Sequence, residues 1–422
     1  MIPVDTLRSS RQNADLTFKL NRRLGRHGWL RLTPAYSVKL VCDLLAAADR
    51  GIRVLDPFSG TATTALCAAY AGDKGAAVEI NPFLTWFGNA KLAQYADSDI
   101  RCAEEVLSEL IHRTTCCRNR AMAPPAMHNV WRWWDQRSLD FLCKFKAALD
   151  EAQPQKGPVR DMLLVIFCRL VIDLSNAAFN HQSMSFKDKA HASQPDANRQ
   201  GLLFSVEPDL GHRAGAEARV VLSSAGDNPG GTGSVVCGDS RRVSDVVQGQ
   251  YDLLITSPPY PNRMSYIREL RPYMYWLGYL ETGRDAGELD WSAIGGTWGI
   301  ATSRLAEWRR SSDGFYPSYF VKILSGIHRA DNKSGTLLSN YVAKYFEDMW
   351  LHIKDVVGVM SSGGVVHYIV GNSTFYDVVV PTEQLLADML VEAGFREPRI
   401  ARIRKRNSKK ELYEFDVSAT KP

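Results

Sequence analysis

Residues 253–260 read LLITSPPY, an apolar run that enters a Thr-Ser-Pro-Pro-Tyr turn. The apolar run predicts a buried strand that ends abruptly in a stiff loop. Pro258 and Pro259 fix φ and remove two backbone donors, so the loop presents acceptors at the Ser257 hydroxyl and the Pro258 carbonyl. With the ring of Tyr260 beside them, these acceptors suit a flat nucleobase that carries an exocyclic amine. Taken alone, the same string also fits an ordinary rigid turn.

The tetrapeptide Ser257-Pro258-Pro259-Tyr260 resembles the catalytic (Asp/Asn/Ser)-Pro-Pro-Tyr motif of the S-adenosylmethionine-dependent amino-methyltransferases of DNA. In that family the Ser form is typical of enzymes that methylate N4 of cytosine. The resemblance implies catalytic roles for these four residues, S-adenosyl-L-methionine as cofactor and double-stranded DNA as partner. It also implies that the target base is flipped out of the duplex. The expected fold is α/β, a doubly wound, mostly parallel seven-stranded sheet of the Rossmann-like methyltransferase type with a large helical insertion.

Composition agrees with a folded enzyme of this size. The chain has 422 residues, of which 45% are hydrophobic and 23% charged, enough for a large core. We find no apolar span long enough to cross a bilayer and no signal peptide at the start, so we expect a cytoplasmic protein. The eight cysteines have no zinc-ligand spacing, so we expect reduced thiols and no metal site.

A second motif lies in residues 53–64, RVLDPFSGTATT, which predict a strand, a turn of small residues and a helix. Small residues let the backbone approach a ligand where a parallel strand ends. The segment resembles the cofactor motif Asp-Pro-Phe-x-Gly-x-Gly of the same family, with Ala62 at the last glycine, and we expect a slightly altered backbone there. The resemblance assigns cofactor contacts to Asp56, Pro57, Phe58, Ser59, Gly60 and Thr61.

Further cofactor contacts are expected at the ends of two other strands. Glu79 ends a strand over 75–79 and could accept both ribose hydroxyls, with Asn81 nearby, or could be a surface carboxylate. Asp239 and Ser240 end a strand over 234–239, where the family places an acidic residue against the cofactor's base; the alternative for Asp239 is a helix N-cap.

The segment before the first strand gives two more candidates. Thr33 is a plausible N-cap, with Pro34 at the first position of a helix over 35–48. Related enzymes close a segment like this one over the methionine part of the cofactor, so Thr33 and Pro34 are assigned to the cofactor site. A plain packing helix is the alternative.

The pattern divides the chain into three regions. Residues 1–100 form an N-terminal arm and the cofactor-binding half of the methyltransferase domain, and residues 101–233 a helical insertion and loop that is the candidate target-recognition region. Residues 234–422 form the catalytic half, with a smaller insertion at about 281–334. Within the insertion, the tryptophan-rich stretch 131–134 is interpreted as core rather than as a base-stacking surface, and the Gly- and Ala-rich residues 208–233 as a flexible linker.

Basic residues suggest where DNA would lie. The net charge is +5, and lysines and arginines gather near both ends of the chain, a pattern that solvated tails also show. The N-terminal group is Arg8, Arg11, Lys19, Arg22, Arg23 and Arg26, and the C-terminal group is Arg399, Arg402, Arg404, Lys405, Arg406, Lys409 and Lys410. Candidate DNA contacts are Lys187, Lys189, Arg263 and Arg406. The turn at 371–373 is a candidate border of the base pocket.

These motifs lead to one principal hypothesis and two alternatives. The principal hypothesis is a site-specific DNA methyltransferase that produces N4-methylcytosine in a restriction-modification or defence system, with a cognate restriction endonuclease as a possible partner. One alternative keeps the chemistry and changes the substrate to adenine N6 in DNA or to a base amine in RNA. The other is a catalytically inactive DNA-binding module, for which Ala62 is the hint.

Overall fold

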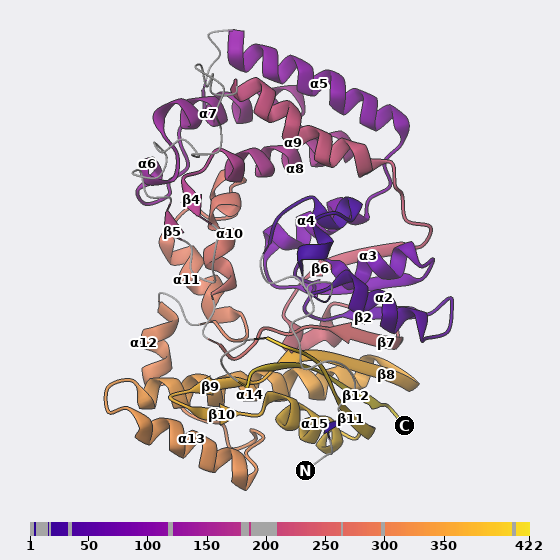
Figure 1. Cartoon of the computed structure of the whole chain (residues 1–422), viewed down its shortest axis with the longest axis vertical. Coiled ribbons are helices and arrows are strands. Elements are labelled where there is room, and N and C mark those ends of the chain that lie inside the picture. Colours follow the sequence, from indigo (N-terminus) through magenta and orange to yellow (C-terminus); the bar gives the residue numbers. More distant parts are fainter. Residues whose placement is uncertain are drawn as a thin grey trace, which may run out of the picture.

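The computed structural model describes residues 4–5, 16, 18–32, 36–116, 121–178, 185–186, 209–262, 265–296, 300–406 and 411–422. In this part of the chain eight strands form the main sheet, in the order β1-β11-β12-β8-β7-β2-β3-β6 (Figure 1). They are β1 (Val4–Asp5), β2 (Arg53–Asp56), β3 (Lys74–Glu79), β6 (Thr232–Cys237), β7 (Tyr251–Thr256), β8 (Met360–Gly371), β11 (Arg396–Lys405) and β12 (Tyr413–Thr420). Strands β6, β3, β2, β7 and β8 are parallel neighbours, and β12 runs antiparallel to β8 and β11. The predicted Rossmann-like, doubly wound sheet of seven strands is confirmed, and the two-residue β1 adds to its edge beside β11.

The alternation of side chains along β2 and β7 explains why helices cover both faces of the sheet. Leu253 and Ile255 pack with Val54 on one face, whereas Leu254 packs with Leu55 on the other. Because successive strand residues point to opposite faces, this apolar run is buried on both sides.

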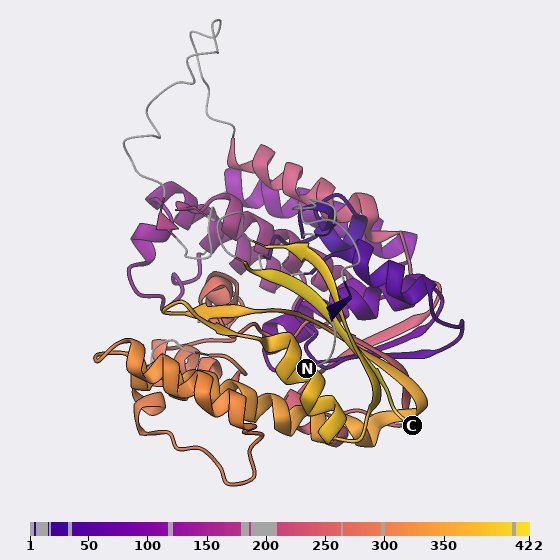
Figure 2. The ribbon, with the colours of Figure 1, turned by 60° about the horizontal axis from the view of Figure 1, so that its bottom comes forward.

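The first face is covered by α2 (Val38–Ala46), α3 (Thr63–Tyr70) and α4 (Pro82–Leu92). The second is covered by α14 (Gly335–Val359), α15 (Thr382–Glu392) and the short 3-10 helix η3 (Ser240–Asp245). Figure 2 shows the strands between these two helical layers. The carboxyl ends of the parallel strands therefore form the edge at which loops can meet a ligand.

A helical segment lies beyond α4. It comprises α5 (Asp97–Cys116), α6 (Val130–Trp133), α7 (Gln136–Ala152), α8 (Pro158–Asp173) and α9 (Leu210–Ala225), with the short antiparallel pair β4 (Ala177–Ala178) and β5 (Ser185–Phe186). Its apolar core is continuous with the buried face of α4. In addition, Trp86 of α4 donates a hydrogen bond to Asp161 of α8 at 2.8 Å. The insertion is thus fused to the sheet domain by a shared core, and its part in target recognition remains a prediction.

The tryptophan-rich stretch at α6 is largely core, as predicted. Trp133 and Trp134 are 6% and 0% exposed, and Trp134 meets Trp276 edge to face with ring centroids 5.6 Å apart. Trp131 is the exception, because 57% of it is exposed.

Residues 210–225 form the helix α9, so the predicted flexible linker at 208–233 is wrong there. Gly211, Ala214, Ala218, Val221 and Ala225 recur at spacings of three and four and are all buried. Their small size lets α9 pack against α5 and α8. The same glycines and alanines that suggest flexibility in a sequence therefore serve close helix packing here.

The second insertion contains α11 (Gly283–Ser292), α12 (Ile300–Glu307) and α13 (Ser318–Ala330), preceded by α10 (Tyr266–Trp276). Helix α13 packs on α14 and on the hairpin of β9 (Ser373–Phe375) and β10 (Val378–Val380). No helix in the described ranges combines the length and apolar character needed to cross a membrane.

The N-terminal segment contains α1 (Phe18–Asn21) and the 3-10 helix η2 (Gly25–Gly28). Helix α2 begins at Val38, so the prediction of a helix from residue 35 with Thr33 as its N-cap is wrong. The Asn21 side chain holds this start: its Oδ1 accepts from Val38 N at 3.0 Å, and its Nδ2 donates to Tyr36 O at 2.9 Å. A side chain 17 positions earlier thus does what a local N-cap was expected to do.

Arg26 is fully buried and cannot belong to a DNA-binding arm. Its Nη1 donates to the carbonyls of Lys91 and Ala93 at 2.9 and 2.6 Å. Its Nη2 donates to Ala225 O at 2.5 Å and to Asn228 Oδ1 at 2.7 Å. The prediction is therefore wrong for this arginine, which joins η2 to α4 and to the end of α9.

Replacing Arg26 with Met should lower the free energy of unfolding by about 3–5 kcal/mol, because four buried acceptors lose their donor. Arg23→Met, at an exposed position of the same segment, is the matched control and should change it by less than about 0.5 kcal/mol. Urea unfolding followed by circular dichroism measures both. Equal midpoints for the two variants would contradict the assigned role of Arg26.

Candidate functional site

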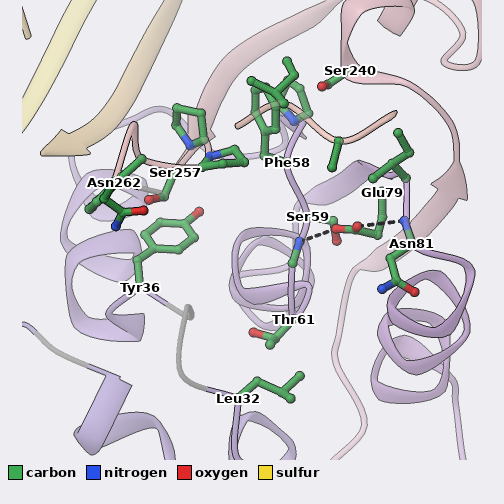
Figure 3. Close-up of a pocket in the computed structure, with 18 of the residues that line it drawn as sticks. Leu32, Tyr36, Phe58, Ser59, Thr61, Glu79, Asn81, Ser240, Ser257 and Asn262 are labelled. Atoms are coloured by element: carbon green, nitrogen blue, oxygen red, sulfur yellow. Dashed lines mark hydrogen bonds between the residues drawn. The ribbon is translucent and has the colours of Figure 1, made fainter. Parts of the chain in front are cut away.

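A cavity of about 790 Å³ opens at the carboxyl ends of the central strands. The loops that follow β2 and β7 both line it, together with the ends of β3, β6, β8 and the β11–β12 hairpin. Its wall includes Leu32, Tyr36, Pro57, Phe58, Ser59, Gly60, Thr61, Glu79, Asn81, Asp239, Ser240, Ser257, Pro258, Pro259, Tyr260, Asn262, Asn372, Ser373, Arg404, Arg406 and Glu414. Figure 3 shows Ser257 and Asn262 at one end, Glu79, Asn81 and Ser240 at the other, and Phe58, Ser59 and Thr61 between them. The structure thus brings the two predicted motifs to one cavity.

Asp56 ties the ends of β2 and β7 together. Its Oδ1 accepts from Thr256 Oγ1 at 2.6 Å and from Phe58 N at 3.1 Å, while Tyr36 OH lies 3.5 Å from Oδ2. Burial raises the pKa of the Asp56 carboxyl to about 6, although these hydrogen bonds oppose the shift. The Asp56 side chain is fully buried and is not among the residues that line the cavity. It therefore has no surface through which to contact a ligand in the cavity. Asp56 instead positions the two loops.

The loop of residues 57–61 lines the cavity as predicted. The Ser59 hydroxyl is buried and has no hydrogen-bond partner within the described ranges. The buried Lys91 of α4 donates to Thr61 O at 2.5 Å. Burial lowers the pKa of this lysine to about 7. A buried unpaired hydroxyl on a cavity wall is the kind of group that a bound ligand satisfies.

The slightly altered backbone expected at Ala62 stays a prediction, and the structure gives the conformation of this residue. It has φ 56° and ψ 36°, the left-handed conformation that a glycine would adopt at this point. An L-residue held there costs about 1 kcal/mol, and no space is lost because the methyl group is buried among Ala65, Leu66 and Val235. Ala62 is therefore held in a conformation that favours glycine.

Glu79 ends β3 and holds both neighbouring loops (Figure 3). Its Oε2 accepts from Gly60 N at 2.8 Å and its Oε1 from Asn81 N at 2.9 Å. Burial raises the pKa of the Glu79 carboxyl to about 7 against these hydrogen bonds. Glu79 is 9% exposed and lines the cavity, so the alternative of a surface carboxylate is wrong. Asn81 also lines the cavity, while its Oδ1 caps α4 by accepting from Phe83 N at 2.9 Å.

Asp239 takes the N-cap role that was its alternative. Its carboxylate accepts from Arg241 N at 2.9 Å and pairs with the Arg241 guanidinium at 2.7 Å. Burial opposes ionisation, but Arg241 more than offsets it and lowers the pKa of the Asp239 carboxyl. Asp239 and Ser240 still line the cavity, with their loop held by His352, which contacts Ser240 O through Nδ1 at 2.6 Å.

The Ser257–Tyr260 loop is braced from two neighbouring elements. The Ser257 hydroxyl donates to Ile369 O of β8 at 3.0 Å and also contacts the Tyr260 phenol, and its oxygen still has accepting capacity. Tyr345 of α14 donates to Pro259 O at 2.8 Å. The loop is therefore held in place with an acceptor at Ser257 on the cavity side.

Tyr260 is held by the β11–β12 hairpin. Its hydroxyl donates to Glu414 Oε1 at 2.8 Å, and Arg404 donates to Glu414 Oε2 at 2.7 Å. The Arg406 guanidinium lies 4.7 Å from the centre of the Tyr260 ring. Burial and the Glu414 carboxylate raise the pKa of the Tyr260 phenol well above its ordinary value, so the group stays a donor.

Several residues of this site were not predicted, or only in part. Tyr36, Arg404 and Glu414 line the cavity but carried no motif of their own, and Arg404 was counted only among the basic residues near the C-terminus. The turn at 371–373 was a candidate border of the cavity, and two of its residues line the wall. The candidates Thr33, Pro34, Lys187, Lys189 and Arg263 lie outside the described residues. Of the candidate DNA contacts only Arg406 is described, and it lies at the cavity.

Searches against protein-family models and against curated proteins find no match. Among solved structures, the chain is similar to TrmN from Thermus thermophilus, with 11% sequence identity, a TM-score of 0.30 and coverage of 97% of this chain and 53% of that chain. The chain thus spans about half the length of that structure. A similarity this weak carries no argument about activity, so the proposal below depends on the geometry of the cavity.

Glu79 predicts how stability changes with pH. The unfolded chain releases this proton near pH 4.5, whereas the folded protein keeps it up to about pH 7. The folded state binds more protons between these values, so stability should fall as the pH rises, by up to about 1.4 kcal/mol per pH unit from this group. Glu79→Gln should flatten that part of the slope in urea titrations between pH 5 and 7. Equal slopes for both proteins would show that the raised pKa is wrong.

Proposed function

We propose that this protein is an S-adenosylmethionine-dependent, site-specific DNA methyltransferase that acts on the N4 amine of cytosine in double-stranded DNA after base flipping. The observation that carries the proposal is the single cavity lined by both predicted motifs, residues 57–61 and 257–260. Its volume of about 790 Å³ suits a nucleoside-sized group beside a second planar ligand, since ligand pockets span roughly 300–1,000 Å³. A restriction-modification or defence role, with a restriction endonuclease as partner, belongs to the same proposal.

The residues at one end of the cavity fit the cofactor. The buried, unpaired Ser59 hydroxyl is available to a polar group of the ligand, and Glu79 retains further lone pairs for ribose hydroxyls. Thr61, Asn81 and Ser240 complete this end. When bound, S-adenosyl-L-methionine supplies a sulfonium methyl: the amine lone pair forms the new N–C bond, the S–C bond pair stays on sulfur, and one amine proton leaves.

The residues at the other end fit the target amine. An exocyclic base amine is a weak nucleophile because its lone pair is delocalised into the ring. Since Ser257 gives its own hydrogen to Ile369 O, its oxygen can accept a hydrogen from the amine and orient the lone pair. Ser257 acts here as an acceptor and forms no covalent bond.

Tyr260 offers a ring for the flipped base. Removing a base from the duplex costs a few kcal/mol, and stacking on an aromatic side chain recovers about 1–3 kcal/mol. The hydrogen bond to Glu414 fixes the orientation of the phenol and therefore of the ring. A ring held in place before the base arrives loses little entropy on binding.

Expression in a host that lacks DNA methylation should place N4-methylcytosine at a defined sequence. Modified-base sequencing with nucleoside analysis measures both the base and the site. N6-methyladenine instead would move the substrate to the adenine alternative. Unmodified DNA, together with no S-adenosylmethionine binding by calorimetry, would contradict the proposal and favour a DNA-binding module.

Ser257→Ala should lower kcat by about 100-fold, because the amine loses an acceptor that acts during transfer. The affinity for S-adenosylmethionine should stay within twofold, since Ser257 lies at the other end of the cavity from Glu79 (Figure 3). Single-turnover methylation and calorimetry separate the two effects. A Ser257→Ala enzyme with full kcat would eliminate the assigned role.

A further inference from the structure

We propose that Arg406 selects cytosine, by donating hydrogen bonds to the acceptor edge of the base next to its amine. This inference rests on the proposed function and deepens it, since it names the residue that distinguishes cytosine from adenine. It starts from the guanidinium of Arg406, which lines the same cavity as Ser257 and lies 4.7 Å from the centre of the Tyr260 ring.

The absence of a side chain at Gly371 leaves room for this guanidinium. Nη1 of Arg406 donates to Asn372 O at 3.1 Å. At the neighbouring Gly371, the last residue of β8, a Cβ atom would lie 2.1 Å from that Nη1. Glycine therefore leaves the space in which the Arg406 side chain lies, and any other residue there would push the guanidinium away from its present position.

Arg406 differs from the nearby Arg404 in whether a carboxylate pairs with its guanidinium. Arg404 pairs with Glu414, which is 5% exposed and also accepts the Tyr260 hydroxyl. The charge of Arg404 is therefore used to hold Tyr260. No carboxylate of the described ranges pairs with Arg406, and a guanidinium has five N–H donors, so Arg406 can offer donors to a ligand.

The edges of the two candidate bases differ next to the amine. Cytosine presents the N4 amine and then two acceptors, N3 and O2. Adenine presents the N6 amine, one acceptor at N1 and then a carbon-bound hydrogen. In this structure the guanidinium lies over the Tyr260 ring, so a base that stacks on that face moves it to the rim of the ring. From the rim, with the amine at Ser257, it can pair with both cytosine acceptors but with only one on adenine. A neutral side chain with one donor would not make this distinction.

The test uses the duplex site that methylome mapping of the wild-type enzyme identifies. Arg406→Met keeps an unbranched side chain, shorter than arginine, and removes every donor. It should lower kcat/KM on that duplex by about 10- to 100-fold while S-adenosylmethionine affinity stays within twofold. Arg399→Met is the matched control, because Arg399 is an exposed arginine on β11, the strand that Arg406 follows, and does not line the cavity. It should stay within threefold of wild type.

A base analogue assigns the effect to the base edge. In 3-deazacytosine a C–H replaces the N3 acceptor and the amine is kept. The wild-type enzyme should lose most of its advantage over Arg406→Met on a duplex with this analogue. Gly371→Ala, which keeps the arginine but fills its space, should reproduce the Arg406→Met loss. An S-adenosylmethionine affinity within twofold of wild type in both variants should exclude a simple folding defect.

Three results would overturn the inference: an Arg406→Met enzyme within twofold of wild type, a loss of equal size on the 3-deazacytosine duplex, or a mapped target base that is adenine. Failure of the proposed function looks different, because the wild-type enzyme itself would then bind no S-adenosylmethionine and modify no DNA.

Discussion

The hydrogen bond from Thr256 to Asp56, 2.6 Å long and fully buried, is the contact on which the site depends. It joins the last residues of β7 and β2, two adjacent parallel strands. A second bond, from Thr64 Oγ1 to Ile255 O at 3.0 Å, ties the start of α3 to the same point. Because both loops leave the sheet from this junction, their relative position is set by buried, directional bonds rather than by the loops themselves. The burial that raises the pKa of Asp56 is the cost of that precision.

Polar groups beneath the surface hold the other loops in a similar way. His352 is fully buried, and burial lowers its pKa to about 4, so the ring is neutral at neutral pH. One nitrogen contacts Ser240 O at 2.6 Å and the other the Tyr368 hydroxyl at 2.9 Å, so a neutral ring can donate with one and accept with the other. Lys91 supports the neighbouring loop by donating to Thr61 O. The cavity wall is thus positioned by side chains that do not themselves line the cavity.

The sequence predicts what depends on neighbours in the chain. The strands at residues 53–56 and 251–256 and the loops that follow them can be recognised because apolar runs, prolines and small residues act over a few positions. Contacts between distant residues escape such patterns. Arg26 looks like part of a basic arm until the carbonyls of α4 and the end of α9, up to 199 positions away, surround it. Asp56 fits a cofactor motif, yet its carboxylate turns toward Thr256, 200 positions later.

The same limit explains the error at α9 and the incomplete prediction for Arg404. From the sequence alone, the glycines and alanines of residues 210–225 indicate a flexible linker. In the structure they allow α9 to pack closely against α5 and α8. Arg404 and Glu414 are separated by only ten residues, but the role of their pair becomes visible only when β12 places Glu414 at the hydroxyl of Tyr260. Sequence patterns therefore predict the cavity and its two motifs, and the tertiary structure adds the residues that hold them.

Charge gives the cavity a direction. Glu79 lies at the end of the cavity opposite Ser257 (Figure 3). The Arg406 guanidinium lies over the ring of Tyr260, which belongs to the same loop as Ser257. In the proposed reaction the cofactor's ribose presents hydroxyl donors, which the oxygens of Glu79 can accept, and its sulfonium is cationic, which the guanidinium end disfavours. The acceptor edge of cytosine has the opposite preference. Each proposed ligand placed at the wrong end would lose its hydrogen-bond partners, and the cofactor would also lie near a like charge. The two ends of the cavity are therefore not interchangeable, and the order in which β2, β3 and β7 lie in the sheet fixes which loop receives which ligand.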